Sequence, residues 1–103
     1  MKGQFESELY SKVQTGELAG SATAVQMPNI PCKLVMFVAM SDNATNVFIG
    51  GSAAVTVAAG TTTTTAGYML DAGDTTPWLP IPNLNLLWYI GGASDDLLYI
   101  ALS

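Results

Sequence analysis

The sequence predicts an all-β domain, either an antiparallel β-sandwich or a jelly-roll-like fold, that follows an N-terminal arm. After Lys33 the chain contains no Lys, Arg, His, Glu or Gln, so the long polar residues that favour helices are missing from its body. Short runs of Thr, Val, Ala and aromatic residues alternate there with Gly, Pro and Asp turn signals. About eight such runs follow Gly20, which is the spacing of a sandwich or a small barrel. We therefore expect one domain over residues 21–103.

Residues 1–20 differ in composition from this body, because they hold all the glutamates and all the lysines except Lys33. Their apolar members include Phe5, Leu9, Tyr10 and Val13. The spacing of four residues from Phe5 to Leu9 and from Leu9 to Val13 fits one face of a helix and equally one face of a strand. We expect residues 1–20 to be an arm whose four apolar side chains bind a partner. The alternative is that they add an edge strand or a helix to the domain.

Five strands are expected in the first part of the domain. The first covers residues 22–27, and a second over residues 34–40 is a continuous apolar run that suits a strand buried on both faces. Residues 46–49 follow a turn, and residues 53–58 alternate weakly between apolar and small side chains. The threonine run at residues 61–65 is β-branched and polar, so we interpret it as an exposed or edge strand.

Turn residues also separate the later strands. Residues 68–70 lead into the Asp-Ala-Gly-Asp turn at 71–74, and residues 78–81 form a short expected edge strand between prolines. Residues 86–90 and 97–102 complete the domain, with Gly-Gly and Asp-Asp turn residues between them. Trp88 and Tyr89 are adjacent on a strand, so their side chains point to opposite faces. One of them can lie in the core while the other faces a neighbour or solvent.

Charge and hydropathy exclude two classes of partner. The net charge is −5, the pI is about 4.1 and there is no Arg, whereas nucleic-acid binding needs a basic surface. The most apolar run, at residues 34–40, is far shorter than the ~20 residues of a membrane-spanning helix. No signal peptide is visible at the N-terminus, and the single Cys32 cannot form an internal disulfide. We expect synthesis in the cytoplasm and no contact with membranes.

Few side chains are suited to chemistry. Without His, neither a Ser-His-Asp arrangement nor a histidine metal site can form. Cys32 lies beside Lys33, which can activate a thiol, but we interpret it as structural. The pairs Asp71/Asp74 and Asp95/Asp96 could act as acid and base or, with Asp42, Asn43 and Asn46, bind calcium; we interpret them as turn residues. We therefore expect no enzymatic activity, no cofactor and no metal.

Composition favours burial of part of the surface between subunits. Charged residues make up 11% of the chain, against about 25% in typical proteins, and hydrophobic residues make up 50%. Obligate interfaces have few charges at their centres. We expect a homo-oligomer, with residues 34–40 and 86–90 in core or inter-subunit packing and Trp78, Trp88 and Tyr89 at the interface. The alternative for these aromatic residues is a carbohydrate site.

Several segments resemble small virion proteins of tailed bacteriophages. They are residues 21–28, 31–35 and 43–51, the turn segment Gly-Tyr-Met-Leu-Asp-Ala-Gly-Asp-Thr-Thr-Pro-Trp at 67–78 and the Asn-Leu-Asn-Leu-Leu-Trp-Tyr-Ile-Gly strand at 83–91. The resemblance implies a capsid decoration (cement) protein or another head or tail accessory protein, β-rich and usually trimeric. Its expected location is the capsid surface of the virion, and its expected partner is the major capsid protein or another virion component. The alternative function is a receptor- or glycan-binding module of a phage tail or fibre.

Overall fold

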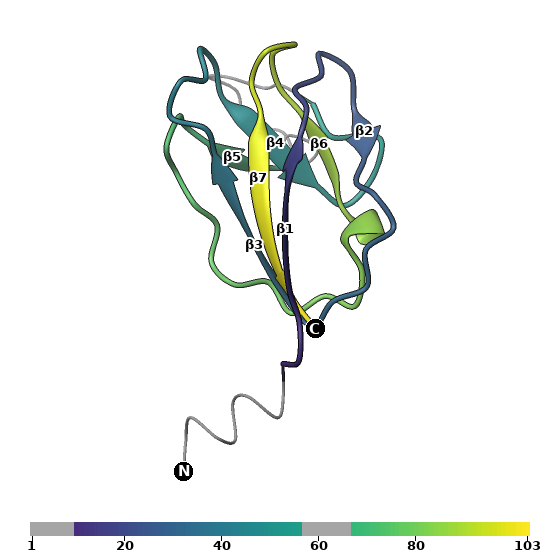
Figure 1. Cartoon of the computed structure of the whole chain (residues 1–103). Helices are drawn as coiled ribbons and strands as arrows, with labels where there is room; N and C mark the ends of the chain where they lie inside the picture. The colour runs from purple at the N-terminus through teal and green to yellow at the C-terminus, as the bar shows by residue number, and fades with distance from the viewer. Residues whose placement is uncertain (1–9, 57–66) are drawn as a thin grey trace.

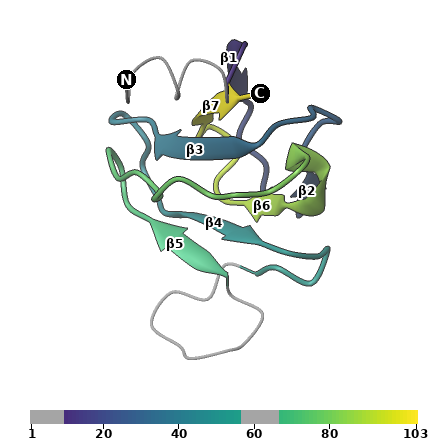
Figure 2. The same ribbon diagram turned by 90° about the horizontal axis from the view of Figure 1, so that it is seen from below.

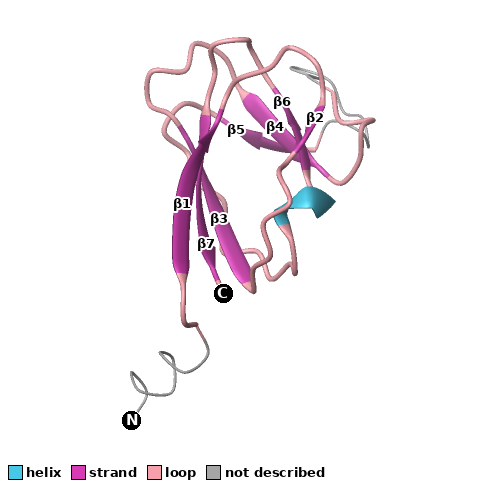
Figure 3. Ribbon diagram, turned by 45° about the vertical axis from the view of Figure 1, so that its right-hand side comes forward, coloured by secondary structure: helices cyan, strands magenta, loops and turns pink. Residues whose placement is uncertain are grey.

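A computed structural model describes residues 10–56 and 67–103 of the chain. Over these residues the chain is all-β, with antiparallel pairing and no α-helix, as predicted (Figure 1). A single turn of 3-10 helix, η1 (Leu84–Leu86), precedes β6 (Figure 3). The strands are β1 (Val13–Leu18), β2 (Val25–Gln26), β3 (Leu34–Ala39), β4 (Val47–Gly50), β5 (Tyr68–Leu70), β6 (Trp88–Ile90) and β7 (Leu97–Leu102).

The strands form two sheets. One has three strands in the order β1-β7-β3, and the other has four in the order β2-β6-β4-β5. The last strand, β7, lies at the centre of the three-stranded sheet, so both neighbours pair with it along its whole length. Seen from below, β1, β7 and β3 form one layer and the four-stranded sheet forms another (Figure 2).

Buried side chains from both sheets make one hydrophobic core. On β7, Leu97, Tyr99 and Ala101 are buried, and the residues between them point the other way, because side chains alternate along a strand. The core cluster consists of Leu18, Met27, Cys32, Val35, Phe37, Ala39, Val47, Ile49, Leu70, Leu84, Tyr89, Leu97, Tyr99 and Ala101. Its members come from six of the seven strands and the connecting segments, so the two sheets are stabilised together.

The segment from Gly73 to Leu79 covers the outer edge of β3. The backbone N–H of Leu79 donates to the carbonyl oxygen of Val35 at 2.8 Å, and the N–H of Val35 donates back at 3.0 Å. Further along, the Thr76 N–H donates to the Phe37 carbonyl at 2.9 Å. Gly73 begins the segment at φ +86°, a left-handed conformation that favours glycine. These bonds leave β3 without an open edge over this stretch.

The expected arm over residues 1–20 is wrong for its second half. Val13–Leu18 form β1, paired with β7 from Val13↔Leu102 to Leu18↔Leu97. The N–H groups of Ser11 and Lys12 also donate to the Ser103 carbonyl, at 2.6 and 2.8 Å. The domain therefore begins no later than Ser11, and the expected boundary at residue 21 is too late. The apolar spacing of the N-terminal residues fitted a strand as well as a helix, and Val13 belongs to a strand.

Other expected strands are shorter than predicted or absent. Residues 34–40 were expected to be buried on both faces, but in β3 only alternate residues are fully buried. Residues 78–81 form only an isolated bridge at Val35↔Leu79, because prolines on both sides prevent a longer ladder. The strand expected at 86–90 begins only at Trp88, because Leu84–Leu86 form η1. Residues 53–56 are not a strand, and the expected strand at 61–65 lies outside the described residues.

Candidate interaction surface

The outer face of the three-stranded sheet is built almost entirely from aliphatic side chains. The register places Leu34 beside Leu102, Met36 beside Ile100 and Val38 beside Leu98, all half-buried. Strand β1 adds three exposed side chains on the same face: Val13, Thr15 and Glu17. Val13 is 68% exposed, and Glu17 is the one charged side chain among these outward residues. We call this surface the outer face.

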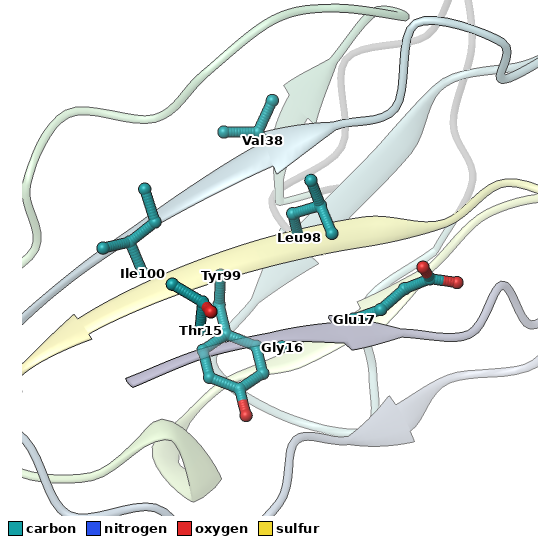
Figure 4. A pocket seen from close by; sticks show the side chains of 7 residues that line it. All are labelled: Thr15, Gly16, Glu17, Val38, Leu98, Tyr99 and Ile100. Carbon is teal, nitrogen blue, oxygen red and sulfur yellow. The ribbon is translucent and has the colours of Figure 1, made fainter. Parts of the chain in front are cut away.

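The outer face is hollowed where the three strands meet. A pocket of about 430 Å³ is lined by Thr15, Gly16, Glu17, Val38, Leu98, Tyr99 and Ile100. Figure 4 shows Val38, Leu98 and Ile100 standing on β3 and β7, with Thr15 and Glu17 on the neighbouring β1. Aliphatic walls with one carboxylate at the rim are suited to a protein side chain and offer little to orient a polar substrate.

Gly16 allows Tyr99 to lie against β1. The two residues are paired across the ladder, and a Cβ atom on Gly16 would lie 2.5 Å from the Tyr99 hydroxyl oxygen and 2.7 Å from its ring. Atoms without a bond cannot approach so closely, so any larger residue would displace the ring. Because Gly16 has no side chain, the buried Tyr99 can pack directly against the backbone of β1.

Asp95 is the most deeply buried charged group in the described residues, with a side chain 2% exposed. Its Oδ1 accepts the Ala44 N–H at 2.8 Å, and its Oδ2 accepts the N–H groups of Gly92 at 3.1 Å and Thr45 at 3.2 Å. The Thr45 hydroxyl also donates to Oδ2. Bonding from the Thr45 side chain and then from these backbone groups lowers the pKa of Asp95, against the opposing effect of burial. Four donors therefore hold the carboxylate in its charged form.

Asp96 and Asn43 extend this cluster to a third loop. The Asn43 side-chain amide donates to the Asp96 carbonyl at 3.0 Å, and the Asp96 N–H donates to Asn43 Oδ1 at 2.9 Å. The Gly20 N–H donates to Asp96 Oδ1 at 2.8 Å. The loops after β1, β3 and β6 are thereby joined. The carboxylates at 95 and 96 bind groups of their own chain, which extends the turn interpretation made from the sequence.

The second aspartate pair also forms a turn. The Asp74 N–H donates to the Asp71 carbonyl at 2.9 Å, and the Asp71 N–H donates to Asp74 Oδ2 at 3.1 Å. Cys32 is buried, its thiol donates to the Ile81 carbonyl at 3.1 Å, and burial raises its pKa. Both findings agree with the structural interpretations. Within residues 10–56 and 67–103, no group of three Asp, Glu, Cys or His side chains is arranged to hold a metal ion.

The residues predicted to contact partners are distributed over several elements. Phe5 and Leu9 lie outside the described residues. Tyr10 is half-buried, and Val13 is the first residue of β1. Trp78 is 43% exposed on the segment that covers β3, and Trp88 is half-buried in β6. Tyr89 belongs to the core, and its hydroxyl donates to the Ala19 carbonyl at 2.8 Å. Tyr89 is therefore not available to a second subunit, in contrast to the prediction.

Leu34, Met36 and Val38 belong to a strand that was predicted to pack in the core or between subunits. Leu98, Ile100 and Leu102 were not predicted to take part in such packing. The signal was present, because residues 97–102 are as uniformly apolar as residues 34–40. A strand with apolar side chains on both faces either lies between two layers or leaves one face for a partner. In both strands, which are adjacent in the sheet, one face lies in the core and the other is only half-buried.

A smaller pocket of about 230 Å³ lies between β4 and the segment that covers β3. Its lining is mostly apolar: Ile49, Gly50, Gly51, Tyr68, Thr76, Pro77, Leu79 and Leu87. Tyr68, at its margin, is 52% exposed. This pocket brings an exposed aromatic ring next to a cavity.

No family model, no curated protein and no solved structure matches the chain. The part of the chain that the structure describes has no helix with the length and apolarity needed to cross a membrane.

Proposed function

We propose that the chain is a structural virion protein of a tailed bacteriophage, a capsid decoration (cement) protein that acts as a homo-oligomer on the capsid surface. Its two sheets around one core would then be a β-sandwich or a jelly-roll-like domain. The observation that carries this proposal is the outer face, a sheet surface with six half-buried aliphatic side chains and a single carboxylate. The phage context comes from the resemblance of residues 21–28, 31–35, 43–51, 67–78 and 83–91.

The physical argument is that an apolar surface of this kind gains free energy when it is covered. Each half-buried aliphatic side chain that becomes fully buried contributes about 1 kcal/mol. Leu34, Met36 and Val38 lie directly beside their partners on β7, so one contact would cover all six together. Large exposed apolar patches on soluble proteins mark interaction sites. A face of this composition is suited to another protein surface, either the shell or a neighbouring copy.

The variant Ile100→Lys tests this surface directly. Ile100 lies at the centre of the outer face and points away from the core, so a lysine there leaves the core packing unchanged but places a charge in the contact. We expect self-association, measured by sedimentation, and binding to empty capsids to weaken at least about tenfold. The matched control is Ser41→Lys, an equal charge change at an exposed turn.

Two results would contradict the proposal. One is a wild-type chain that sediments as a monomer and does not bind capsids at micromolar concentration. The other is an Ile100→Lys protein that behaves as Ser41→Lys does in both assays. Mass spectrometry of purified virions from the encoding phage adds the copy number: hundreds of copies support the capsid surface, and a dozen or fewer would place the protein at the tail or portal. The resemblance implies a trimer, which sedimentation also measures.

The smaller pocket favours a second candidate, the receptor- or glycan-binding module. Tyr68 is exposed at its margin, and Trp78 is exposed on the same segment as its lining residues Thr76 and Pro77. Exposed aromatic rings can stack on sugars. Titration of the tryptophan fluorescence with bacterial surface glycans would test it, with Tyr68→Ala as the variant expected to weaken binding. Unchanged fluorescence across a glycan panel would remove this candidate.

A further inference from the structure

Strand β1 has the longest open edge among the strands that the structure describes. It lies at the end of the sheet order β1-β7-β3, whereas the outer edge of β3 is covered by the segment from Gly73 to Leu79. The end strands of the other sheet, β2 and β5, have only two and three residues. β1 has six, and its side chains are exposed from Val13 to Thr15 and again at Glu17.

The pairing with β7 determines which backbone groups of β1 point outward. Lys12 and Ser103 exchange both hydrogen bonds, at 2.8 and 3.0 Å. In an antiparallel ladder such pairs occur at every second residue, so Gln14, Gly16 and Leu18 also bond to β7. The N–H and C=O groups of Val13, Thr15 and Glu17 consequently point away from the sheet. Within the described residues, no backbone hydrogen bond is made from this side.

This edge lacks the features that usually prevent strand addition. Natural edge strands are protected by proline, lysine, bulges, shortness or a covering segment. Residues 13–18 contain neither proline nor lysine, and the register with β7 runs without a bulge. Glu17 is the only charge. An unprotected edge of this length is a site for an added strand, whose main-chain hydrogen bonds supply affinity.

We propose that β1 pairs antiparallel with β1 of a second copy, about a two-fold axis at Thr15. The edge is self-complementary in this register, because Thr15 faces Thr15 and Val13 faces Glu17 of the partner, so no like charges meet. All three outward residues then find partners, which gives about six inter-chain backbone bonds. The two three-stranded sheets would continue into one another, and their outer faces would form one apolar surface.

The side chains on the inner side of β1 support the same register. Gln14 would lie opposite Gly16 of the partner, where the Tyr99 ring rather than a side chain of β1 covers the inner side of the strand. The Tyr99 hydroxyl is the nearest atom to the Cβ position of Gly16, at 2.5 Å, so it occupies that place beside the strand. The amide of Gln14 would therefore come within reach of a phenol hydroxyl on the second copy. A register shifted by two residues would lose this match.

A contact through one edge is small. It buries less than the roughly 800 Å² per partner of a standard stable interface, so we expect a weak pair in dilute solution that gains strength where many copies bind one shell. This inference rests on the proposed self-association, but it uses the edge of β1, whereas the outer face carries the proposed function. The two can therefore fail separately.

Cysteine cross-linking tests the pairing at low affinity. The two Thr15 residues would have Cα atoms about 5.5 Å apart, within the range of a disulfide. Thr15→Cys should form a disulfide-linked dimer under mild oxidation at least about tenfold faster than the matched control Ser41→Cys, which is exposed but lies in a turn. Cys32 is buried, so the native chain should not cross-link. Equal rates for the two variants would overturn the proposal.

A second variant measures the uncross-linked protein. Thr15→Pro removes an N–H that points away from β7, so no hydrogen bond within the chain is lost. It should weaken concentration-dependent dimerisation in sedimentation while the thermal midpoint stays close to that of the native chain. Ile100→Lys should reduce capsid binding and leave the Thr15→Cys cross-link unchanged. A closed trimer that shows no Thr15→Cys cross-link would overturn the two-fold pairing and leave the proposed capsid role standing.

Discussion

Asp95 shows how a single buried charge can organise several loops. Its two oxygens accept hydrogen bonds from Ala44, Thr45 and Gly92, residues that are distant from it or separated by a turn. Gly20 packs against the same place, since a Cβ there would lie 2.5 Å from the Asp95 nitrogen and 2.6 Å from the Gly92 oxygen. Each of the four groups that bond to the carboxylate is a hydrogen-bond donor. The site therefore requires an acceptor with full negative charge.

Replacing Asp95 with asparagine tests this requirement. One acceptor oxygen would become an amide NH₂ group facing backbone donors, which cannot reverse their direction. We expect the free energy of unfolding to fall by about 1–3 kcal/mol, the cost of leaving a buried donor unpaired. Urea denaturation measures it, with Asp42→Asn at an exposed turn as the matched control with no comparable loss. A variant as stable as its control would show that the carboxylate is not needed.

The lowered pKa of Asp95 should make the stability of the fold depend on pH. The folded-state pKa of Asp95 is lowered from the ordinary value of 3.8, so folding favours the ionised form. Its stabilising contribution is fully present above pH 3.8 and is lost as the pH falls through the lower folded pKa, because the unfolded chain binds more protons in that window. The thermal midpoint should therefore fall below about pH 4. Asp95→Asn should fall less steeply over the same range, and an equal slope would contradict the assignment.

At the scale of elements, β1 depends on a glycine as much as on its apolar residues. Gly16→Ala places a methyl group 2.5–2.7 Å from the Tyr99 side chain, which must then shift from its position in the core. We expect this overpacking to cost about 1–3 kcal/mol in the free energy of unfolding, measured by urea denaturation. Gly51→Ala is the control, because nothing lies within 4 Å of its Cβ position. If both variants lose the same free energy of unfolding, the contact between Tyr99 and Gly16 is not as tight as the structure has it.

Local patterns predict some elements well and others poorly. The strand at residues 97–102 is predictable because a continuous apolar run follows turn residues, and the structure has it as β7. β1 is not predictable from its own residues, since Gln14 and Gly16 face inward, where apolar side chains would be expected. Leu84–Leu86 form η1 because Asn83 caps them, its Oδ1 accepting the Asn85 N–H at 3.0 Å. Such short-range polar bonds leave little trace in hydrophobic periodicity.

The candidate surface is predictable only in part, for a related reason. The apolar run at residues 34–40 indicates that both faces of a strand avoid water, but it does not say what covers them. Phe37 is buried in the core, whereas Met36 faces outward beside Ile100. The hydrogen bonds of Asp95 are still harder to predict from the sequence, because its donors at Ala44 and Thr45 are about fifty residues away in the chain. Contacts of that range follow from the sheet topology, which periodicity does not determine.

At the scale of the whole molecule, charge opposes association and apolar surface favours it. Each copy carries a net charge of −5, so copies repel one another at low ionic strength. The outer face has one carboxylate and no cation, and cross-chain ion pairs can therefore contribute little there. Added salt shortens the Debye length from about 10 Å at 0.1 M to about 3 Å at 1 M and removes most of the repulsion.

Self-association should therefore strengthen as salt is added, with a dissociation constant several-fold lower in 1 M than in 0.1 M sodium chloride. Sedimentation equilibrium at both concentrations measures the change. Lysozyme or another monomeric protein of similar size serves as a control for non-ideality, and Ile100→Lys should associate more weakly than the native chain at both salt concentrations. Association driven by ion pairs would instead weaken on salt addition, because the attraction would be screened. That outcome would mean that charged side chains elsewhere on the chain, and not the outer face, hold the subunits together.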